Sequence, residues 1–194
     1  MPTWSSDGAW IAFVTWDETG GHIWKAPSNG AGEPIRLSES TALWADPVWT
    51  PDGQGLIALR APLGSTLAAS GPGSDAVPSD AELVYVSSSG GSERILSLEK
   101  DARWPHFGTD PARVYLSSDS EGLVSVSVDG HDRQVIATPE VRGATLRLSP
   151  DGSSILEMSG PNVSIHSAPA NELTGGALTT PEPLSIAMQS PGLI

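Results

Sequence analysis

Histidine and carboxylate side chains are the residues of this chain that could bind a catalytic metal ion. A metal-dependent hydrolase of the His-x-His type needs two imidazoles at alternate positions of one strand, because that spacing points both at the same ion. The chain has four histidines, none within 20 residues of another: His22, His106, His131 and His166. Carboxylate pairs such as Asp17-Glu18 and the run 117–122 lack the ligand spacing of a calcium loop. The sequence therefore predicts no metal site.

Motifs for nucleophilic catalysis and for phosphate binding are also missing from the sequence. A serine hydrolase of the α/β class carries its nucleophile in Gly-x-Ser-x-Gly, and no such pentapeptide occurs. The absence of cysteine excludes thiolate nucleophiles, disulfides and Cys-based zinc sites. Gly30-Ala31-Gly32 and Gly71-Pro72-Gly73 lack the third glycine and the following helix that bind a phosphate. We therefore predict no catalytic residue and no cofactor.

Four aspartates recur along the chain at spacings of 45, 58 and 41 residues. Three of them lie in a Ser/Thr-x-Asp-Gly turn that precedes a short apolar run, and in the third copy Asp-Pro replaces Asp-Gly. Aspartate bonds backbone amides locally, and glycine takes the left-handed conformation that closes a hairpin with a bulge. We interpret these residues as structural turn formers: Asp7, Gly8, Asp52, Gly53, Asp110, Asp151 and Gly152.

A second set of turns follows alternating strands further along each unit. The turns are Asn29-Gly30, Gly90-Gly91 and Asp129-Gly130, and we expect each to be a tight hairpin. Each unit then contains four short antiparallel strands in about 40–45 residues, which is the period of a propeller blade. The aromatic residues before the first turns, Trp4, Trp49 and Phe107, are expected to be buried against a neighbouring sheet.

This pattern predicts an all-β chain, a β-propeller segment of about four four-stranded antiparallel blades. The blades are expected at 1–44, 45–101, 102–142 and 143–186. The 58-residue spacing locates an insertion at 61–81, rich in Gly, Ser, Ala and Pro, between the second and third strands of the second blade. The outer strand of the last blade is expected at 183–186, and 187–194 resembles the truncated start of another unit.

The pattern Pro-x-Trp-Ser/Thr-x-Asp-Gly-x-x-x-Ile-Ala resembles the TolB-like, or WD40-like (PD40), propeller repeat. A longer likeness runs from Asp46 to Asp151 and includes Asp46-Pro47-Val48-Trp49-Thr50-Pro51-Asp52-Gly53 and Arg103-Trp104-Pro105-His106-Phe107-Gly108. It is similar to the N-terminal propeller region of bacterial amidohydrolases that carry TolB-like repeats ahead of a metal-dependent domain. The resemblance implies a larger propeller, six- or seven-bladed, of which this chain would be an open arc. It also implies that C–N bond hydrolysis resides in a domain this chain lacks.

The resulting functional prediction is a non-catalytic module for protein interaction or substrate gating, with a protein partner or an attached hydrolase domain. One alternative is the propeller part of a prolyl-oligopeptidase-type or tricorn-type serine peptidase. Another is a self-contained enzyme that uses residues in the propeller channel. The expected inner strands offer His106 and Arg147 as the candidates for such a channel role.

Charge and aromatic content limit the partners. The net charge is −13, with 10 basic and 23 acidic residues, which argues against nucleic acid because phosphate binding needs a basic face. No apolar run approaches the roughly 20 residues of a membrane span. The resembled family is usually exported, but the N-terminus lacks the features of a signal peptide, so localisation stays undecided. All seven tryptophans lie at or before position 104. They could form an exposed aromatic face, and the terminal blades could then support self-association.

Overall fold

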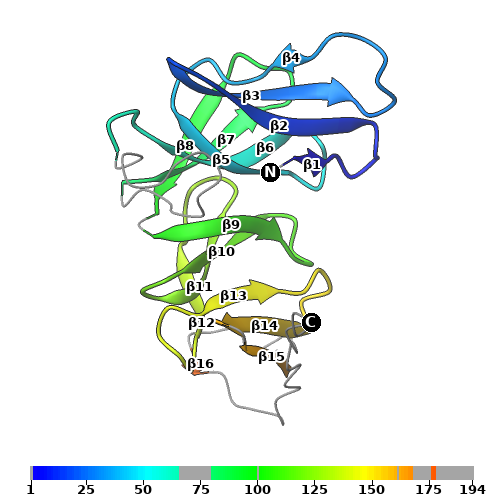
Figure 1. Ribbon diagram of the computed structural model, residues 1–194. Helices are drawn as coiled ribbons and strands as arrows, with labels where there is room; N and C mark the ends of the chain where they lie inside the picture. The colour runs from blue at the N-terminus through cyan, green and yellow to red at the C-terminus, as the bar shows by residue number, and fades with distance from the viewer. Residues whose placement is uncertain (1, 66–79, 100, 161, 168–175, 178–194) are drawn as a thin grey trace, which may run out of the picture.

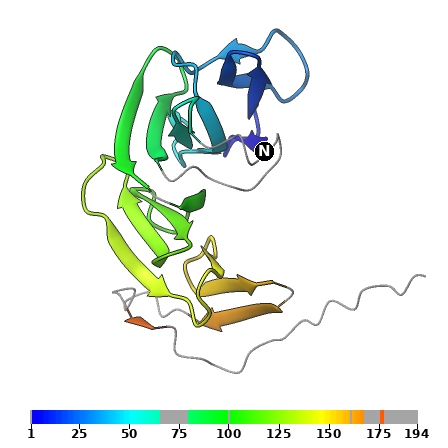
Figure 2. The ribbon, with the colours of Figure 1, turned by 60° about the vertical axis from the view of Figure 1, so that its left-hand side comes forward.

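The structure is a computed structural model that describes residues 2–65, 80–99, 101–160, 162–167 and 176–177. Every regular element in these residues is a β-strand, which confirms the all-β prediction. The strands form four sheets that follow one another along a curved arc (Figures 1 and 2). None of the described residues lies in a helix long and apolar enough to cross a membrane.

The first two sheets are four-stranded and antiparallel, with strand order following chain order. Blade 1 contains β1 (Thr3–Trp4), β2 (Trp10–Asp17), β3 (Gly20–Pro27) and β4 (Ile35–Arg36). Blade 2 contains β5 (Leu43–Trp49), β6 (Gly55–Ala61), β7 (Glu82–Ser87) and β8 (Glu93–Leu98). The connection between β6 and β7 spans 62–81, so the predicted insertion at 61–81 includes the last residue of β6, and its residues 66–79 lie outside the described part.

The last two sheets depart from the four-strand pattern. Blade 3 contains β9 (Ala102–Phe107), β10 (Arg113–Ser118), β11 (Gly122–Ser127) and β12 (Gln134–Thr138). A short β16 (Gly176–Ala177) adds to it in parallel with β12, which the sequence did not predict. Blade 4 contains β13 (Thr145–Leu148), β14 (Ser154–Ser159) and β15 (Asn162–Ser167). The outer strand predicted at 183–186, and the tail 187–194, lie outside the described residues.

The second set of turns is longer than predicted. The loops between β3 and β4, β7 and β8, and β11 and β12 span 28–34, 88–92 and 128–133 rather than two residues. In each loop a glycine with positive φ donates its N–H to the carbonyl three residues earlier. The donors are Gly30, Gly90 and Gly130. These glycines are left-handed turn residues, as predicted, but the chain continues as a loop after each of them before the next strand begins.

The core lies between the sheets rather than within any one of them. Three buried apolar clusters join blade 1 to blade 2, blade 2 to blade 3, and blade 3 to blade 4. Ile23 of blade 1 and Leu56 of blade 2 are fully buried in the first of these clusters. Each blade is therefore stabilised by its neighbours, as expected of stacked repeats.

The prediction that the motif aromatics are buried holds for Trp49 and fails for Trp4. Trp49 is 6% exposed because blade 1 packs over it, whereas Trp4 is 62% exposed. The described part of the chain places no sheet over the corresponding side of blade 1. Burial of this aromatic is thus set by the neighbouring blade and not by the motif.

Candidate functional site

The turn aspartates use one carboxylate oxygen to organise the hairpin between the first two strands of a blade. In blade 2, Asp52 Oδ1 accepts the Thr50 hydroxyl at 2.6 Å and the Gln54 N–H at 3.0 Å. The N–H of Gly53, at φ 69°, donates to the Thr50 carbonyl at 2.9 Å. The turns at Asp7 and Asp151 repeat this arrangement with serine hydroxyls. Each of these three aspartates therefore accepts a hydroxyl and a backbone N–H of its own turn.

The turn at Asp110 lacks the hydroxyl donor, and the turn at Asp129, in the outer hairpin of blade 3, has both the hydroxyl and the backbone donor. Asp110 accepts the Ala112 N–H at 2.9 Å, but Gly108 stands where the other copies have a hydroxyl donor. Conversely, in the outer hairpin of blade 3, Asp129 Oδ1 accepts from the hydroxyl of Ser127 and from the N–H of His131. This equivalence was not predicted, although Ser127-Val128-Asp129-Gly130 has the same Ser-x-Asp-Gly pattern.

These hydrogen bonds favour the charged carboxylate. The hydroxyl of Ser149 is the largest cause that lowers the pKa of Asp151, to about 2, and the N–H of Ser153 adds to it. The pKa values of Asp7, Asp52 and Asp129 are lowered for the same reason. A carboxylate held ionised in this way is a poor general acid or base near neutral pH.

His106 lies on β9 and is 7% exposed. Its Nδ1 lies 3.0 Å from the carbonyl of Trp104, and its Nε2 accepts the N–H of Leu148 at 3.0 Å across the junction between blades 3 and 4. Burial lowers the pKa of His106 to about 4, so the ring is neutral near pH 7. Its Nε2 therefore joins the inner strands β9 and β13, while its Nδ1 makes a contact within β9.

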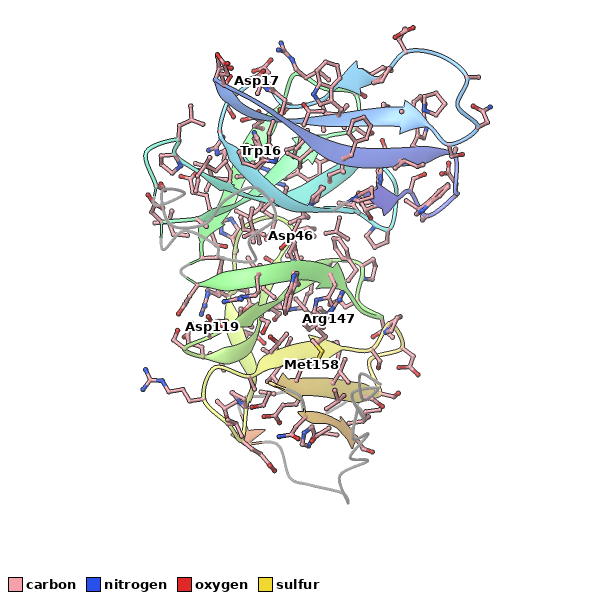
Figure 3. The ribbon with its side chains drawn as sticks, viewed as in Figure 1. Trp16, Asp17, Asp46, Asp119, Arg147 and Met158 are labelled. Carbon is pink, nitrogen blue, oxygen red and sulfur yellow. The ribbon has the colours of Figure 1, made fainter. Side chains whose placement is uncertain are left out.

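Arg147 lies on β13 and is exposed, and Figure 3 shows it at the level of blade 4. Its charge adds to the effect of burial in lowering the pKa of His106. The two residues occupy the same position of successive blades, four residues before the turn aspartates Asp110 and Asp151. The channel role of both stays a prediction.

Two inner strands are bulged at a residue that precedes a proline. Asp46, before Pro47, has φ 48°, and Trp104, before Pro105, has φ 54°. Positive φ is uncommon for residues other than glycine and is retained where the surroundings hold it. Here the Trp104 N–H donates to Asp46 Oδ2 at 3.3 Å and ties blade 3 to blade 2. This pair was not predicted from the sequence, because the inner strands were expected to begin at Pro47 and Pro105, whereas β5 and β9 begin four and three residues before these prolines.

Ion pairs hold the segments that connect successive blades. Glu93 accepts the N–H groups of Glu39 and Ser40, and Arg60 Nη1 binds Glu93 at 2.8 Å. These charges therefore join blade 1 to blade 2 through the segment between them.

The next connection carries a second ion pair. The carboxylate of Glu99 is fully buried and lies 3.1 Å from Arg133 Nε. Glu121 binds the same guanidinium. Although burial opposes the charge, the hydrogen bonds that Arg133 donates to Glu121 and Glu99 raise its pKa overall. This pair joins blade 2 to blade 3.

The remaining histidines do not meet one another. His22 lies 3.3 Å from the hydroxyls of Ser38 and Thr41, and His131 is exposed in a loop. His166 is 2% exposed, and its Nε2 lies 3.0 Å from Glu157 Oε2 without hydrogen-bond alignment. Within the described residues, no group of three or more His, Asp or Glu side chains is placed to hold a metal ion.

A cavity of about 460 Å³ lies where the β10–β11 turn meets the connection from blade 3 to blade 4. Two carboxylates of its lining are already paired, because Arg103 binds Asp119 and Arg133 binds Glu121. The lining has neither a histidine nor a lysine that could act beside them. Its charged members are Asp119, Glu121, Glu140 and Arg142.

Comparison with known proteins identifies the fold. No family model matches the chain, and no curated protein matches it. TolB from Acinetobacter baumannii superposes with a TM-score of 0.62 at 15% identity, over 89% of this chain and 41% of that chain. A putative TolB from Agrobacterium tumefaciens gives 0.61 at 20% identity, over 86% and 60%. A gluconolactonase from Xanthomonas campestris gives 0.59 at 16% identity, over 94% and 62%.

The chain folds as a TolB-like β-propeller. It spans less than two thirds of the length of each of these structures. Identities this low establish the fold alone, and one fold supports many functions.

Proposed function

We propose that this chain is a non-catalytic TolB-like propeller segment that serves as an interaction or gating module for a hydrolase, either attached or a separate partner. The resemblance to the propellers of bacterial amidohydrolases suggests the class of that hydrolase. C–N bond hydrolysis would then be carried out by a metal-dependent domain outside these residues.

One observation carries the proposal: on the described inner strands, the histidine and the aspartate that could act as an acid or a base, His106 and Asp46, are hydrogen-bonded to backbone groups of the blades. His106 accepts one backbone N–H and contacts a carbonyl through its other nitrogen, and a pKa of about 4 leaves it neutral. Asp46 accepts the N–H of Trp104 across a blade junction. A general base needs a lone pair aimed at substrate, and that of His106 Nε2 is directed at Leu148.

The proposal is tested by turnover. Purified chain is assayed against aryl amide, ester and lactone substrates, with and without added Zn²⁺, and the expected rate equals that of buffer. Reading the coding sequence on both sides provides the second measurement. A His-x-His domain in frame supports the amidohydrolase relationship, and a Gly-x-Ser-x-Gly domain replaces it with a serine peptidase.

A self-contained enzyme is the second candidate, because one structural neighbour with similar coverage is a gluconolactonase. In that case turnover should be lost in Arg147→Ala, which changes an exposed side chain of an inner strand. The matched control is Arg94→Ala on β8 of blade 2, where the guanidinium binds the carbonyls of Val128 and Asp129. Turnover that survives in the control and is lost in Arg147→Ala would contradict the non-catalytic proposal.

A further inference from the structure

Blade 1 presents an apolar face whose counterpart on blade 2 is buried. Its members alternate along β1, β2 and β3 and lie in two cross-strand rows, Trp4–Ile11–Ala26 and Phe13–Trp24. The residues at the same positions of blade 2 are at most 6% exposed, because they pack against blade 1. We call the blade 1 set the rear face. Its blade 2 counterparts are Trp49, Leu56, Val86, Ala58 and Val84.

The rear face is open in the described part of the chain. Trp4 is 62% exposed, and Ile11, Phe13, Trp24 and Ala26 are half-buried. The indole Nε1 of Trp24 is buried and has no hydrogen-bond partner among the described residues. Single exposed apolar residues are common on protein surfaces, but a contiguous apolar face of this kind indicates an association surface.

Blade 4 presents the complementary side of such a contact. Arg147, Leu156 and Ile165 form one cross-strand row, and Met158 and Val163 form the next. We call these five residues the front face. Ile165 is 43% exposed and Arg147 is exposed, and Figure 3 shows Met158 and Arg147 on adjacent strands. The same positions in blade 2 pack against blade 3 and hold Val48, Ile57, Tyr85, Leu59 and Leu83.

Two of the three junctions show one pairing rule on the inner strands, and the middle junction is compatible with it. In each such pair, one residue lies four positions before the turn aspartate of its own blade. Its partner lies on the next blade, three positions before the turn aspartate of that blade. The Trp49 indole N–H donates to the Thr3 carbonyl at 3.3 Å, and the Leu148 N–H donates to His106 Nε2 at 3.0 Å. Val48 and Phe107 pack on one cluster at the middle junction. The rule places Arg147 of blade 4 against a residue in the position of Trp4.

We propose that the front face of one copy docks on the rear face of a second copy, so that the chain associates head to tail. The contact continues the blade stacking already present within the chain. It also brings an exposed guanidinium onto an exposed indole, a favourable cation–π pair. The chain already places Arg60 5.7 Å from the Trp44 ring centroid and Arg103 5.7 Å from that of Trp104. Such an interface uses two different surfaces, so it either closes a ring or propagates.

The occupant is a second copy because one chain contains both halves of the contact. The net charge of −13 opposes association at long range and is screened by salt. Association should therefore strengthen from low to moderate ionic strength, the reverse of an interface held by opposite net charges.

Two variants with one damaged face each test the arrangement. In Phe13→Asp the rear face is charged, and in Met158→Asp the front face is charged. Sedimentation velocity should show concentration-dependent association for the unmodified chain and a monomer for each variant. An equimolar mixture of the two should form a dimer and stop there, because one intact front face and one intact rear face remain. Leu98→Asp, at a residue 72% exposed on blade 2, is the matched control and should associate like the unmodified chain.

Variants at exposed side chains guard against a folding defect. Arg147→Glu and Trp4→Lys should each weaken association roughly tenfold. The double variant should recover association, because the new carboxylate of one copy then faces the new ammonium group of the other. Circular dichroism confirms that each variant is folded. A monomeric unmodified chain at all concentrations, or a single variant that still dimerises while the mixture forms no heterodimer, would overturn the proposal. Turnover of the unmodified chain is measured separately from its association, so failure of the docking proposal can be told apart from failure of the interaction-module proposal on which it does not depend.

Discussion

At the residue scale, the aspartates of the repeated turns have acidic side chains that could act in a catalytic site, but they accept hydrogen bonds within their own turns. Each complete turn places a hydroxyl donor and a backbone donor on one carboxylate oxygen, as Thr50 and Gln54 do on Asp52. Those donors stabilise the charge and lower the pKa. The charged carboxylate accepts the hydrogen bonds that hold its turn, so protonation of the carboxylate should lower the stability of the fold.

We expect the free energy of unfolding to fall between pH 4 and pH 2. The native pKa of Asp151, about 2, lies below its ordinary value of 3.8. Its contribution is thus present above pH 3.8 and is lost as the pH falls through the native value. Urea unfolding midpoints measured across this range should fall less steeply in Asp151→Asn. Asp110→Asn, in the turn that lacks the hydroxyl donor, should leave the slope closer to that of the unmodified chain, and equal slopes in all three proteins would contradict the expectation.

His106 should produce a second pH dependence at higher pH. Its pKa is about 4 in the native state and 6.5 ordinarily, so the unfolded chain binds more protons between these values. Stability should therefore fall as the pH drops from 6.5 to 4, and His106→Gln should remove this part of the slope. His106→Leu leaves the buried Leu148 N–H without its acceptor and should cost about 1–3 kcal/mol at pH 7. A pH profile unchanged by His106→Gln would show that the ring is solvated.

At the scale of elements, blades are joined by buried charges as well as by apolar faces. The connection between blades 2 and 3 carries Glu99, whose carboxylate is fully buried and accepts from Ser97 and Arg133. Arg133 comes from the β11–β12 loop of blade 3 and also binds Glu121. The pair fixes how blade 3 sits on the segment that leads into it.

Arg133→Met should destabilise the chain by about 2–4 kcal/mol, because it leaves a buried carboxylate without its counter-charge. The lower bound allows for the partial exposure of the guanidinium, which solvent screens. Glu99→Gln in the same chain should recover part of the loss, since the neutral amide needs no counter-charge. Urea unfolding of the two single variants and the double variant gives the coupling. Additive losses would show that the two side chains act independently.

The four-strand repeat and its first turns could be predicted from the sequence because local chemistry determines them, whereas the length of the outer loops and the added strand β16 could not. The glycines of the first turns take positive φ as expected, since that conformation is what Gly8, Gly53 and Gly152 contribute. Burial could not be predicted in the same way. Trp4 and Trp49 occupy the same position of the motif, but Trp4 is 62% exposed and Trp49 is 6% exposed, because a neighbouring blade covers Trp49 alone.

The contacts between blades likewise could not be predicted from the sequence. Arg133 and Glu99 are 34 residues apart, and Glu93 and Glu39 are 54 apart. No periodicity of the chain relates such residues, because the repeat preserves turns and strands while each junction uses its own charges. The candidate residues His106 and Arg147 were found from their place on the inner strands, but the bonds of His106 to its backbone partners needed the structure.

At the scale of the whole molecule, the described residues form an arc with two inner blades that have neighbours on both sides and two outer blades that have one neighbour each among these residues (Figure 2). In stacked repeats, stability is approximately the sum of the blades and their interfaces. The terminal blades, with one interface each, should therefore open more readily than blades 2 and 3.

Hydrogen exchange should report both this gradient and its change on association. Amides of β6, β7, β10 and β11 should exchange most slowly, and those of β1–β3 and β13–β15 faster, because local opening follows the packing that each blade loses. Head-to-tail docking gives both terminal blades a second interface, so raising the protein concentration should slow exchange in those two blades and leave the inner blades unchanged. Binding that is specific to the native state stabilises it by mass action. In Met158→Asp the concentration dependence should vanish at both ends of the arc, although the substitution lies only in blade 4. Persistence of the effect in blade 1 of that variant would mean that its rear face is covered by something other than the front face of another copy.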